Sequence, residues 1–173
     1  IGEFDPYTGE FLRSIGGQGY AHGSSWTRGQ AWAIYGFALS YRHTKKEKYL
    51  DCAQKIADYF ISNIPQSGLI PVDFCQPEDC TFEDSTAAAI AACGMLEIAK
   101  SVGGSEENPY HQEALRLLRA LYENRCDWLP KTDAIVQKCT AAYHDKEHEF
   151  TIIYGDYFFI EAIWKLTRQE LFL

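Results

Sequence analysis

The segment from Gly17 to Trp32 reads GQGYAHGSSWTRGQAW, in which a glycine-rich loop leads directly into a helix. Ser25 is of a residue type that caps helix N-termini, so we expect it to cap this helix. Arg28 and Trp32 are four residues apart and therefore lie on one helix face. The helix dipole favours carboxylates at this end, and a guanidinium binds a carboxylate through two hydrogen bonds. The pair suits an anionic ring ligand; the alternative is that Trp32 packs in the core and Arg28 makes a local contact.

Apolar residues recur every three and four positions in five stretches of the chain, a spacing typical of amphipathic helices. We expect helices over residues 26–43, 47–63, 85–102, 109–125 and 153–168. Asp84 or Ser85 is the expected N-terminal cap of the third helix, and Gly103-Gly104 its end. Because the β-branched runs are short and interrupted, the sequence predicts an all-α fold without a strand of appreciable length.

The connections between these helices differ in length. Those over residues 44–46 and 103–108 are short, whereas the segments 1–25, 64–84 and 126–152 are long. Alternate connections of an up-down array lie at the same end, so the three long segments should gather where the first, third and fifth helices begin. Loops of this length are usually functional. The same three helices are the more apolar ones, which predicts that they form an inner layer and the other two an outer layer.

The composition describes one globular domain. With 173 residues, 46% of them hydrophobic, the chain is long enough to bury a substantial core. Its formal net charge of −8 and the lack of a basic stripe argue against nucleic acid as a partner. No apolar run is long enough to span a membrane. The six cysteines lack metal-binding spacing, so we expect reduced thiols, no metal and a cytoplasmic location; a Cys75–Cys80 bridge or metal contact is the alternative.

Four stretches resemble one family of carbohydrate-active enzymes. From Gln18 to Arg42 the chain reads QGYAHGSSWTRGQAWAIYGFALSYR, which resembles the signature of glycoside hydrolase family 88, the unsaturated glucuronyl hydrolases. The stretches PVDF (71–74), DSTAAAIAA (84–92) and IYGDYFFIEA (153–162) resemble later family motifs in the same order. The related family 105, the unsaturated rhamnogalacturonyl hydrolases, tends to read RGNGW where this chain has RGQAW, so family 88 is the better match.

The resemblance implies an (α/α)6 barrel, a ring of six helical hairpins. The chain supplies a lead-in strand-like segment, two hairpins and one further inner helix, so we expect residues 1–173 to form a single domain that is the C-terminal half of such a barrel. The catalytic N-terminal half would then be absent from this chain. Half a ring exposes the inner-helix flanks at residues 87–95 and 152–163, so we expect self-association or binding to its own N-terminal half.

By resemblance, the full-length protein is a bacterial hydrolase of unsaturated uronyl oligosaccharides that hydrates the C4=C5 double bond of the terminal uronic acid. Members of the family use no cofactor, and their catalytic aspartates and a histidine lie upstream of the matched region. No catalytic residue is therefore assigned in this chain, and the chain alone should be inactive. The resemblance places Gln18, Trp26, Arg28 and Trp32 in the cleft that binds the substrate.

Other polar groups lie at the end of the long loops. The segment from Tyr143 to His148 could contact the leaving sugar or a sulfate on it, or it could be a solvated charged loop; we include Tyr143 among the substrate-binding residues. Asp73, Asp84 and Asp156 suit loop and cap roles better than catalysis, because acids near helix N-termini complement the dipole.

Two other classes of protein are compatible with parts of the pattern. One is a different helical-toroid enzyme, such as a family 105 hydrolase or a sugar epimerase. The other is a non-catalytic, glycan-binding helical scaffold. The RGQAW stretch argues against the first class, and the concentration of aromatic residues in loops at one end argues against the second.

Overall fold

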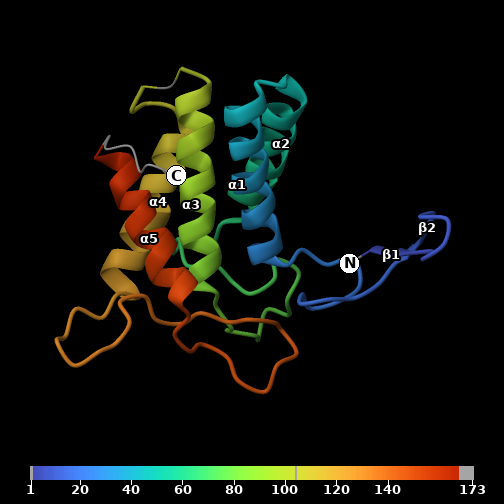
Figure 1. Cartoon of the computed structure of the whole chain (residues 1–173). Coiled ribbons are helices and arrows are strands. Elements are labelled where there is room, and N and C mark those ends of the chain that lie inside the picture. The colour runs from blue at the N-terminus through green and yellow to red at the C-terminus, as the bar shows by residue number, and fades with distance from the viewer. Residues whose placement is uncertain (1, 104, 168–173) are drawn as a thin grey trace.

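The computed structural model describes residues 2–103 and 105–167, and in this part the chain forms a short hairpin followed by five helices (Figure 1). The helices are α1 (Thr27–Thr44), α2 (Glu47–Asn63), α3 (Ser85–Ser101), α4 (Pro109–Asn124) and α5 (Ile153–Leu166). The five helices predicted from the apolar spacing are thus confirmed, with small differences at their ends. The predicted end of the last one, residue 168, lies outside the described residues.

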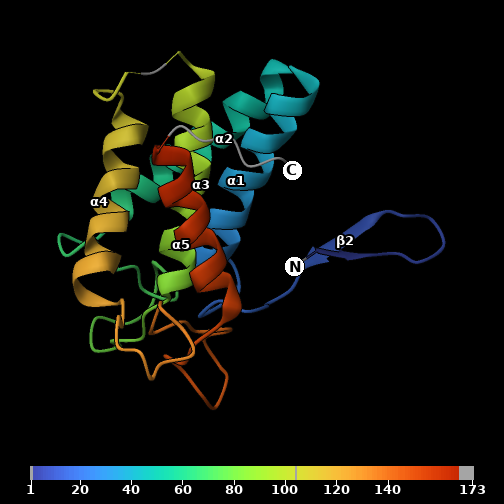
Figure 2. The ribbon, with the colours of Figure 1, turned by 60° about the vertical axis from the view of Figure 1, so that its left-hand side comes forward.

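Helix α3 is the centre of the helical array. Every residue from Ser85 to Ala99 is buried. Helices α1 and α5 pack on either side of α3, and α2 and α4 lie behind this row (Figures 1 and 2). The predicted inner layer of α1, α3 and α5 and the outer layer of α2 and α4 are confirmed.

Of the two inner-helix flanks expected to be exposed, the one on α3 is buried. Residues 87–95 were expected on an open flank, but the alanines from Ala87 to Ala92, together with Cys93 and Met95, have no exposed area. The reason is that the neighbouring helices of this same chain already cover α3 on several sides. The second expected flank is exposed: large apolar side chains of α5 reach solvent, namely Ile153, Tyr157, Ile160, Ile163 and Trp164.

The start of α1 also differs from the expectation. Ser25 does not cap the helix; the N-cap position is Trp26, which makes no side-chain capping bond. Instead, the backbone N–H of Thr27 donates to the carbonyl of Val72 at 3.1 Å, and its hydroxyl bonds the Pro71 and Val72 carbonyls. A segment 45 residues further along the chain therefore satisfies the first helical N–H group.

Local signals do set the ends of α3. The Asp84 carboxylate accepts a hydrogen bond from the backbone N–H of Thr86, as expected for an N-cap. After the helix, Gly103 adopts φ +72°, a left-handed conformation that glycine reaches without strain.

The strand content of the described residues is low, as the sequence predicted. Strands β1 (Gly2–Phe4) and β2 (Phe11–Ser14) form an antiparallel hairpin that projects away from the helices (Figures 1 and 2). Its turn is held by the Asp5 carboxylate, which accepts from the backbone N–H groups of Tyr7 and Thr8. Both strands are too short to give a periodic signal in the sequence.

No helix within the described residues combines the length and apolarity that crossing a bilayer requires.

Helices α1 and α3 are closely packed at Gly94. A Cβ atom added there would lie 2.7 Å from Ile34 Cγ2 and 2.8 Å from the backbone nitrogen of Tyr35. Since one contact is with backbone, α1 itself would have to move.

We expect Gly94→Ala to destabilise the fold by about 1–3 kcal/mol, the usual cost of overpacking a core. Gly36→Ala is the matched control, because Gly36 lies in α1 with nothing within 4 Å of the added Cβ. That substitution should stabilise the helix by roughly 0.5–1 kcal/mol, since alanine has the better helix propensity. Urea unfolding followed by circular dichroism measures both changes. Equal effects of the two substitutions would contradict the close packing of α1 on α3.

Candidate functional site

Three loops meet at one end of the helices, as their lengths predicted. The segments 64–84 and 126–152 lie together below the helices in Figure 1, with residues 17–25 of the predicted segment 1–25; the hairpin in its first part projects away. Single backbone bridges join Trp26 to Asp73 and Pro71 to Glu83. The backbone N–H of Tyr143 donates to the Gln18 carbonyl at 2.8 Å, which links the last loop to the first. The inner helices therefore begin in one continuous layer of loops.

Asp73 organises the first of these loops. Its carboxylate is fully buried and accepts from the backbone N–H groups of Tyr20 and Ser25 at 2.9 and 3.0 Å, and from the Ser24 hydroxyl at 2.6 Å. A Cβ at Gly19 would lie 2.6 Å from Asp73 Oδ2, so only glycine fits there. These contacts support the loop role that we assigned to this acid.

Arg28 is buried and bound to Asp84 within the chain. Its Nε donates to Asp84 Oδ2 and its Nη2 to Oδ1, both at 2.8 Å, and Nη2 also donates to the Thr140 carbonyl. The side chains of the pair are 6% and 0% exposed. We expected the carboxylate of a bound ligand to accept two hydrogen bonds from this guanidinium. In the structure, the Asp84 carboxylate accepts them instead. In the described part of the chain, only Nη1 of this guanidinium has no acceptor.

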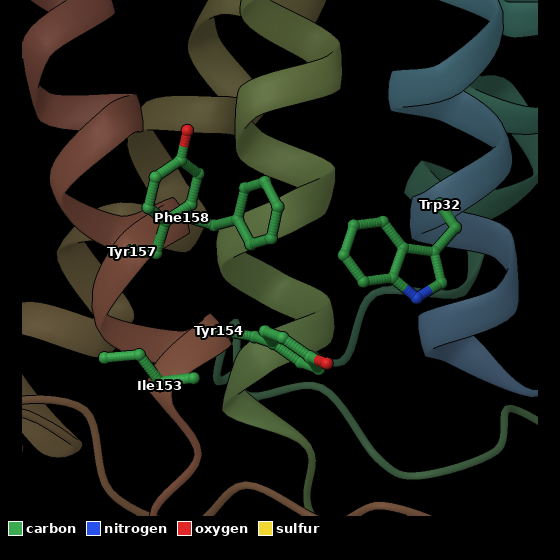
Figure 3. Close-up of a pocket in the computed structure, with 5 residues that line it drawn as sticks. All are labelled: Trp32, Ile153, Tyr154, Tyr157 and Phe158. Atoms are coloured by element: carbon green, nitrogen blue, oxygen red, sulfur yellow. The ribbon is translucent and has the colours of Figure 1, made fainter.

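An open aromatic pocket of about 580 Å³ lies between α1 and α5 (Figure 3). Trp32 forms one wall from α1, and its ring centroid is 5.2 Å from Phe158 and 6.2 Å from Tyr154, both edge-on. Trp32 is 37% exposed and so is not packed into the core as the alternative required. The residues that line the pocket are Trp32, Ile153, Tyr154, Tyr157 and Phe158.

The α5 residues of this pocket were missed in the sequence. They belong to the stretch IYGDYFFIEA, where attention fell on the acid Asp156. That carboxylate instead accepts from the backbone N–H groups of Ile135 and Val136 at 3.0 and 2.7 Å, and so fixes the last loop to α5. The sequence signal that could have identified these pocket residues was the set of aromatic residues in the first turns of an apolar helix.

Tyr143 lies in an aromatic cluster of the loop layer. Its ring meets Tyr20 edge-on at 5.0 Å and also contacts Phe82, which stacks on His148 at 3.9 Å. A hydrogen bond with the Cys80 thiol, followed by desolvation, raises the pKa of Tyr143 to about 12. The segment is therefore partly packed, with its exposed residues at positions 144–147.

The five predicted binding residues fall into separate groups. Gln18 is exposed and joined to Tyr143 through the backbone. Trp26 is half-buried with its ring against Gly29, and its buried Nε1 has no partner in the described part of the chain. Trp32 faces α5, and Arg28 is held by Asp84. Among the residues that the structure describes, no side-chain hydrogen bond, ion pair or ring contact joins these groups. Among the described residues, no cluster of three or more potential metal ligands occurs, and the six cysteines are unpaired.

Comparison with known proteins identifies close relatives, although no protein-family model matches the chain. An unsaturated glucuronyl hydrolase of Bacillus sp. strain GL1 is 36% identical over 177 residues, covering 95% of this chain and 45% of that protein. An unsaturated chondroitin disaccharide hydrolase of Streptococcus pneumoniae is 31% identical, covering 96% of this chain and 43% of that protein. The chain thus spans less than half the length of these relatives.

Solved structures agree in fold. The crystal structure of the Bacillus sp. GL1 enzyme matches with a TM-score of 0.84 at 34% identity, over 95% of this chain and 45% of that one. An unsaturated glucuronyl hydrolase specific for heparin matches with a TM-score of 0.87 at 27% identity, over 95% and 46%. A Streptococcus agalactiae mutant enzyme complexed with dGlcA-GalNAc6S matches with a TM-score of 0.82 at 31% identity, over 98% and 47%.

The motifs, the two layers of helices and these matches agree: the chain belongs to the unsaturated glucuronyl hydrolases, glycoside hydrolase family 88, and its helices form part of the (α/α)6 barrel of these enzymes.

Proposed function

We propose that this chain is the C-terminal, substrate-binding part of an enzyme that hydrolyses unsaturated uronyl oligosaccharides. The observation that carries the proposal is the aromatic pocket between α1 and α5, at the end of the helices where the three loops gather. The relatives support it, since they are named unsaturated glucuronyl or chondroitin disaccharide hydrolases. No observation favours the alternatives, which are a family 105 activity, a sugar epimerase and a non-catalytic scaffold.

The pocket suits a sugar ring in size and chemistry. Its volume of about 580 Å³ lies within the range typical of small-molecule sites, roughly 300–1,000 Å³. Aromatic rings bury the apolar C–H faces of a pyranose, while hydroxyl groups at the rim stay accessible. Trp32 is the stacking surface in this proposal, and the hydroxyls of Tyr154 and Tyr157 supply polar contacts.

The loop layer supplies the remaining contacts of the proposed cleft. The exposed Gln18 amide and the Tyr143 hydroxyl can form hydrogen bonds with sugar hydroxyl groups. Trp26 is the least accessible candidate, and we assign it to the wall of the cleft. Arg28 binds the substrate carboxylate through Nη1 alone, because Asp84 and Thr140 occupy the other donors.

The proposed reaction hydrates the C4=C5 double bond of the terminal unsaturated uronic acid. A carboxylic acid donates a proton to C4, positive charge develops at C5 and the ring oxygen, and water adds at C5. The resulting hemiketal opens and expels the leaving sugar. Asp73, Asp84 and Asp156 each anchor backbone N–H groups or a cation, so we place the proton donor in an N-terminal half that this chain lacks.

The exposed face of α5 is the proposed surface for that N-terminal half. Its exposed apolar residues are Ile153, Tyr157, Ile160, Ile163 and Trp164. Helix α5 stands at one end of the row of inner helices, where a closed barrel would continue (Figure 1). A contiguous apolar surface of this kind marks an interaction site. Residues 1–173 then form one domain, part of a toroid that is completed by the missing half or, in its absence, by another copy.

The first prediction concerns activity. The protein encoded by the whole reading frame that contains this chain should hydrate an unsaturated chondroitin disaccharide and so remove its ultraviolet absorbance. The 173-residue chain alone should not. Trp32→Ala should lower kcat/KM by about 5–30-fold, the loss of roughly 1–2 kcal/mol of ring contact. Trp128→Ala is the control, since this exposed tryptophan does not line the pocket. Turnover by the isolated chain would overturn the placement of the proton donor.

A second prediction separates the two roles of Arg28. Arg28→Ala should destabilise the fold by about 3–5 kcal/mol, because it leaves the buried Asp84 carboxylate without its partner. Arg28→Lys keeps a cation near Asp84 and should fold better, yet it lacks the free Nη1 donor and should raise KM. Arg13→Ala is the control, because the Arg13–Glu3 pair is exposed and worth at most about 1 kcal/mol. Wild-type KM in a folded Arg28→Lys enzyme would remove Arg28 from the substrate site.

A third prediction concerns assembly. The isolated chain should form dimers or larger species in size-exclusion chromatography with light scattering, because the α5 face has no cover. Ile160→Lys should shift the chain toward monomer, since Ile160 is half-exposed within that face. Tyr122→Lys, at a similarly exposed position on the outer helix α4, should leave the assembly unchanged. A strictly monomeric wild-type chain would contradict the proposed role of this face.

A further inference from the structure

A buried polar cluster lies deeper between the three inner helices than the pocket does. The Tyr35 hydroxyl on α1 donates a hydrogen bond to Glu161 Oε1 on α5. Lys165 Nζ, also on α5, lies 3.2 Å from Glu161 Oε1 and 2.5 Å from Oε1 of Glu97 on α3. Arg42 Nη1 approaches the same Glu97 oxygen at 3.4 Å. We use the term inner-helix brace for Tyr35, Glu97, Glu161 and Lys165.

Three members of the brace are almost completely removed from water, and the Lys165 side chain is 16% exposed. Tyr35, Glu97 and Glu161 are 8%, 4% and 3% exposed. Burial, with the Glu161 hydrogen bond second, raises the pKa of Tyr35, so its phenol stays protonated and remains a donor. Burial alone would lower the pKa of Lys165, but its bonds to Glu97 and Glu161 outweigh burial and raise it.

Stability alone does not explain such a cluster. Removing charges from water costs several kcal/mol per ion, and well-packed apolar residues in place of a buried ion pair are often as stable or more so. The surroundings on α3 are apolar: Met95, Leu96 and Ile98 next to Glu97 are all buried, and Glu97 is the only charged residue from Ser85 to Ala99. Directional hydrogen bonds instead define a single arrangement of the helices that carry them.

The brace is one helical turn from the pocket on both of its walls. Tyr35 follows Trp32 by three residues on α1, and Glu161 follows Phe158 by three residues on α5, so each pair shares a helix face. The Phe158 ring bridges the two levels, with its centroid 5.2 Å from Trp32 and 6.0 Å from Tyr35. Because α1 and α5 both pack on α3, the Tyr35–Glu161 bond joins the two walls directly across it.

We propose that Tyr35 and Glu161 are positioning residues, whose hydrogen bond sets the width of the pocket between Trp32 and the α5 aromatic residues. Glu97 and Lys165 hold the Glu161 carboxylate in place from α3 and α5. The part of this inference that concerns substrate rests on the proposed function. The part that concerns the geometry of Trp32 does not.

The test removes one hydroxyl group. Tyr35→Phe keeps the ring against Phe158 but breaks the bond to Glu161, while Glu161→Gln keeps a side-chain oxygen that can accept from Tyr35. Tyr110→Phe is the matched control: its hydroxyl donates to Asp58 Oδ1 at 2.8 Å and joins the outer helices α4 and α2. Each variant is made with and without Trp32→Phe, so that the fluorescence of Trp32 is obtained by difference.

In the isolated chain, acrylamide should quench the Trp32 component more strongly in Tyr35→Phe than in the wild type, and Glu161→Gln and Tyr110→Phe should leave it unchanged. In the protein from the whole reading frame, Tyr35→Phe should raise KM for an unsaturated disaccharide by roughly two- to tenfold with kcat nearly constant. Glu161→Gln should retain wild-type KM.

Unchanged Trp32 quenching in Tyr35→Phe would overturn the proposal, as would an equal change in Tyr110→Phe. Failure of Tyr35→Phe to fold would also overturn it, since the hydroxyl would then serve folding and not pocket geometry. If the whole protein has no hydrolase activity, the proposed function fails, while the fluorescence result still decides whether Tyr35 and Glu161 position the pocket.

Discussion

The buried ion pair between Arg28 and Asp84 connects three parts of the chain that are distant in sequence. Arg28 lies in the first turn of α1, Asp84 caps α3, and the Thr140 carbonyl, in the last long loop, accepts from the same guanidinium. A cation in this setting is tolerated only with its partners in place. The pair therefore fixes how α1 starts against α3, and with it the direction in which Trp32, one turn later on the same face, points toward α5.

Acidic residues of the loop layer share a common role. Asp73, Asp84 and Asp156 each accept hydrogen bonds from backbone N–H groups of segments far from them in sequence. In a chain with a proposed carbohydrate site, such acids invite a catalytic assignment. Their bonding shows instead how long irregular loops satisfy their backbone donors near the core. The rigid helices then carry the stacking surfaces, and the anchored loops carry the polar groups.

The inner helices combine two kinds of packing. Around α3 the contacts involve alanine and glycine, which let the helices approach closely but give little directional preference. The brace of Tyr35, Glu97, Glu161 and Lys165 supplies that direction with hydrogen bonds. Close apolar packing thus gives the layer its cohesion, while a few buried polar bonds define the relative placement of the helices beside the pocket.

The sequence by itself determined the five helices, their inner and outer layers, the gathering of the long loops and the family, because these depend on residues three or four apart, on loop lengths and on contiguous motifs. Local chemistry also gave Asp84 or Ser85 as the cap of α3, and the cap is Asp84. Only the tertiary structure decided that the Val72 carbonyl, and not the Ser25 side chain, accepts the first N–H group of α1. It also decided that Asp84 is the partner of Arg28, and that Trp32 faces Tyr154 and Phe158. Each of these choices joins groups at least 45 residues apart, and such pairings are set by how the helices pack and not by any local spacing.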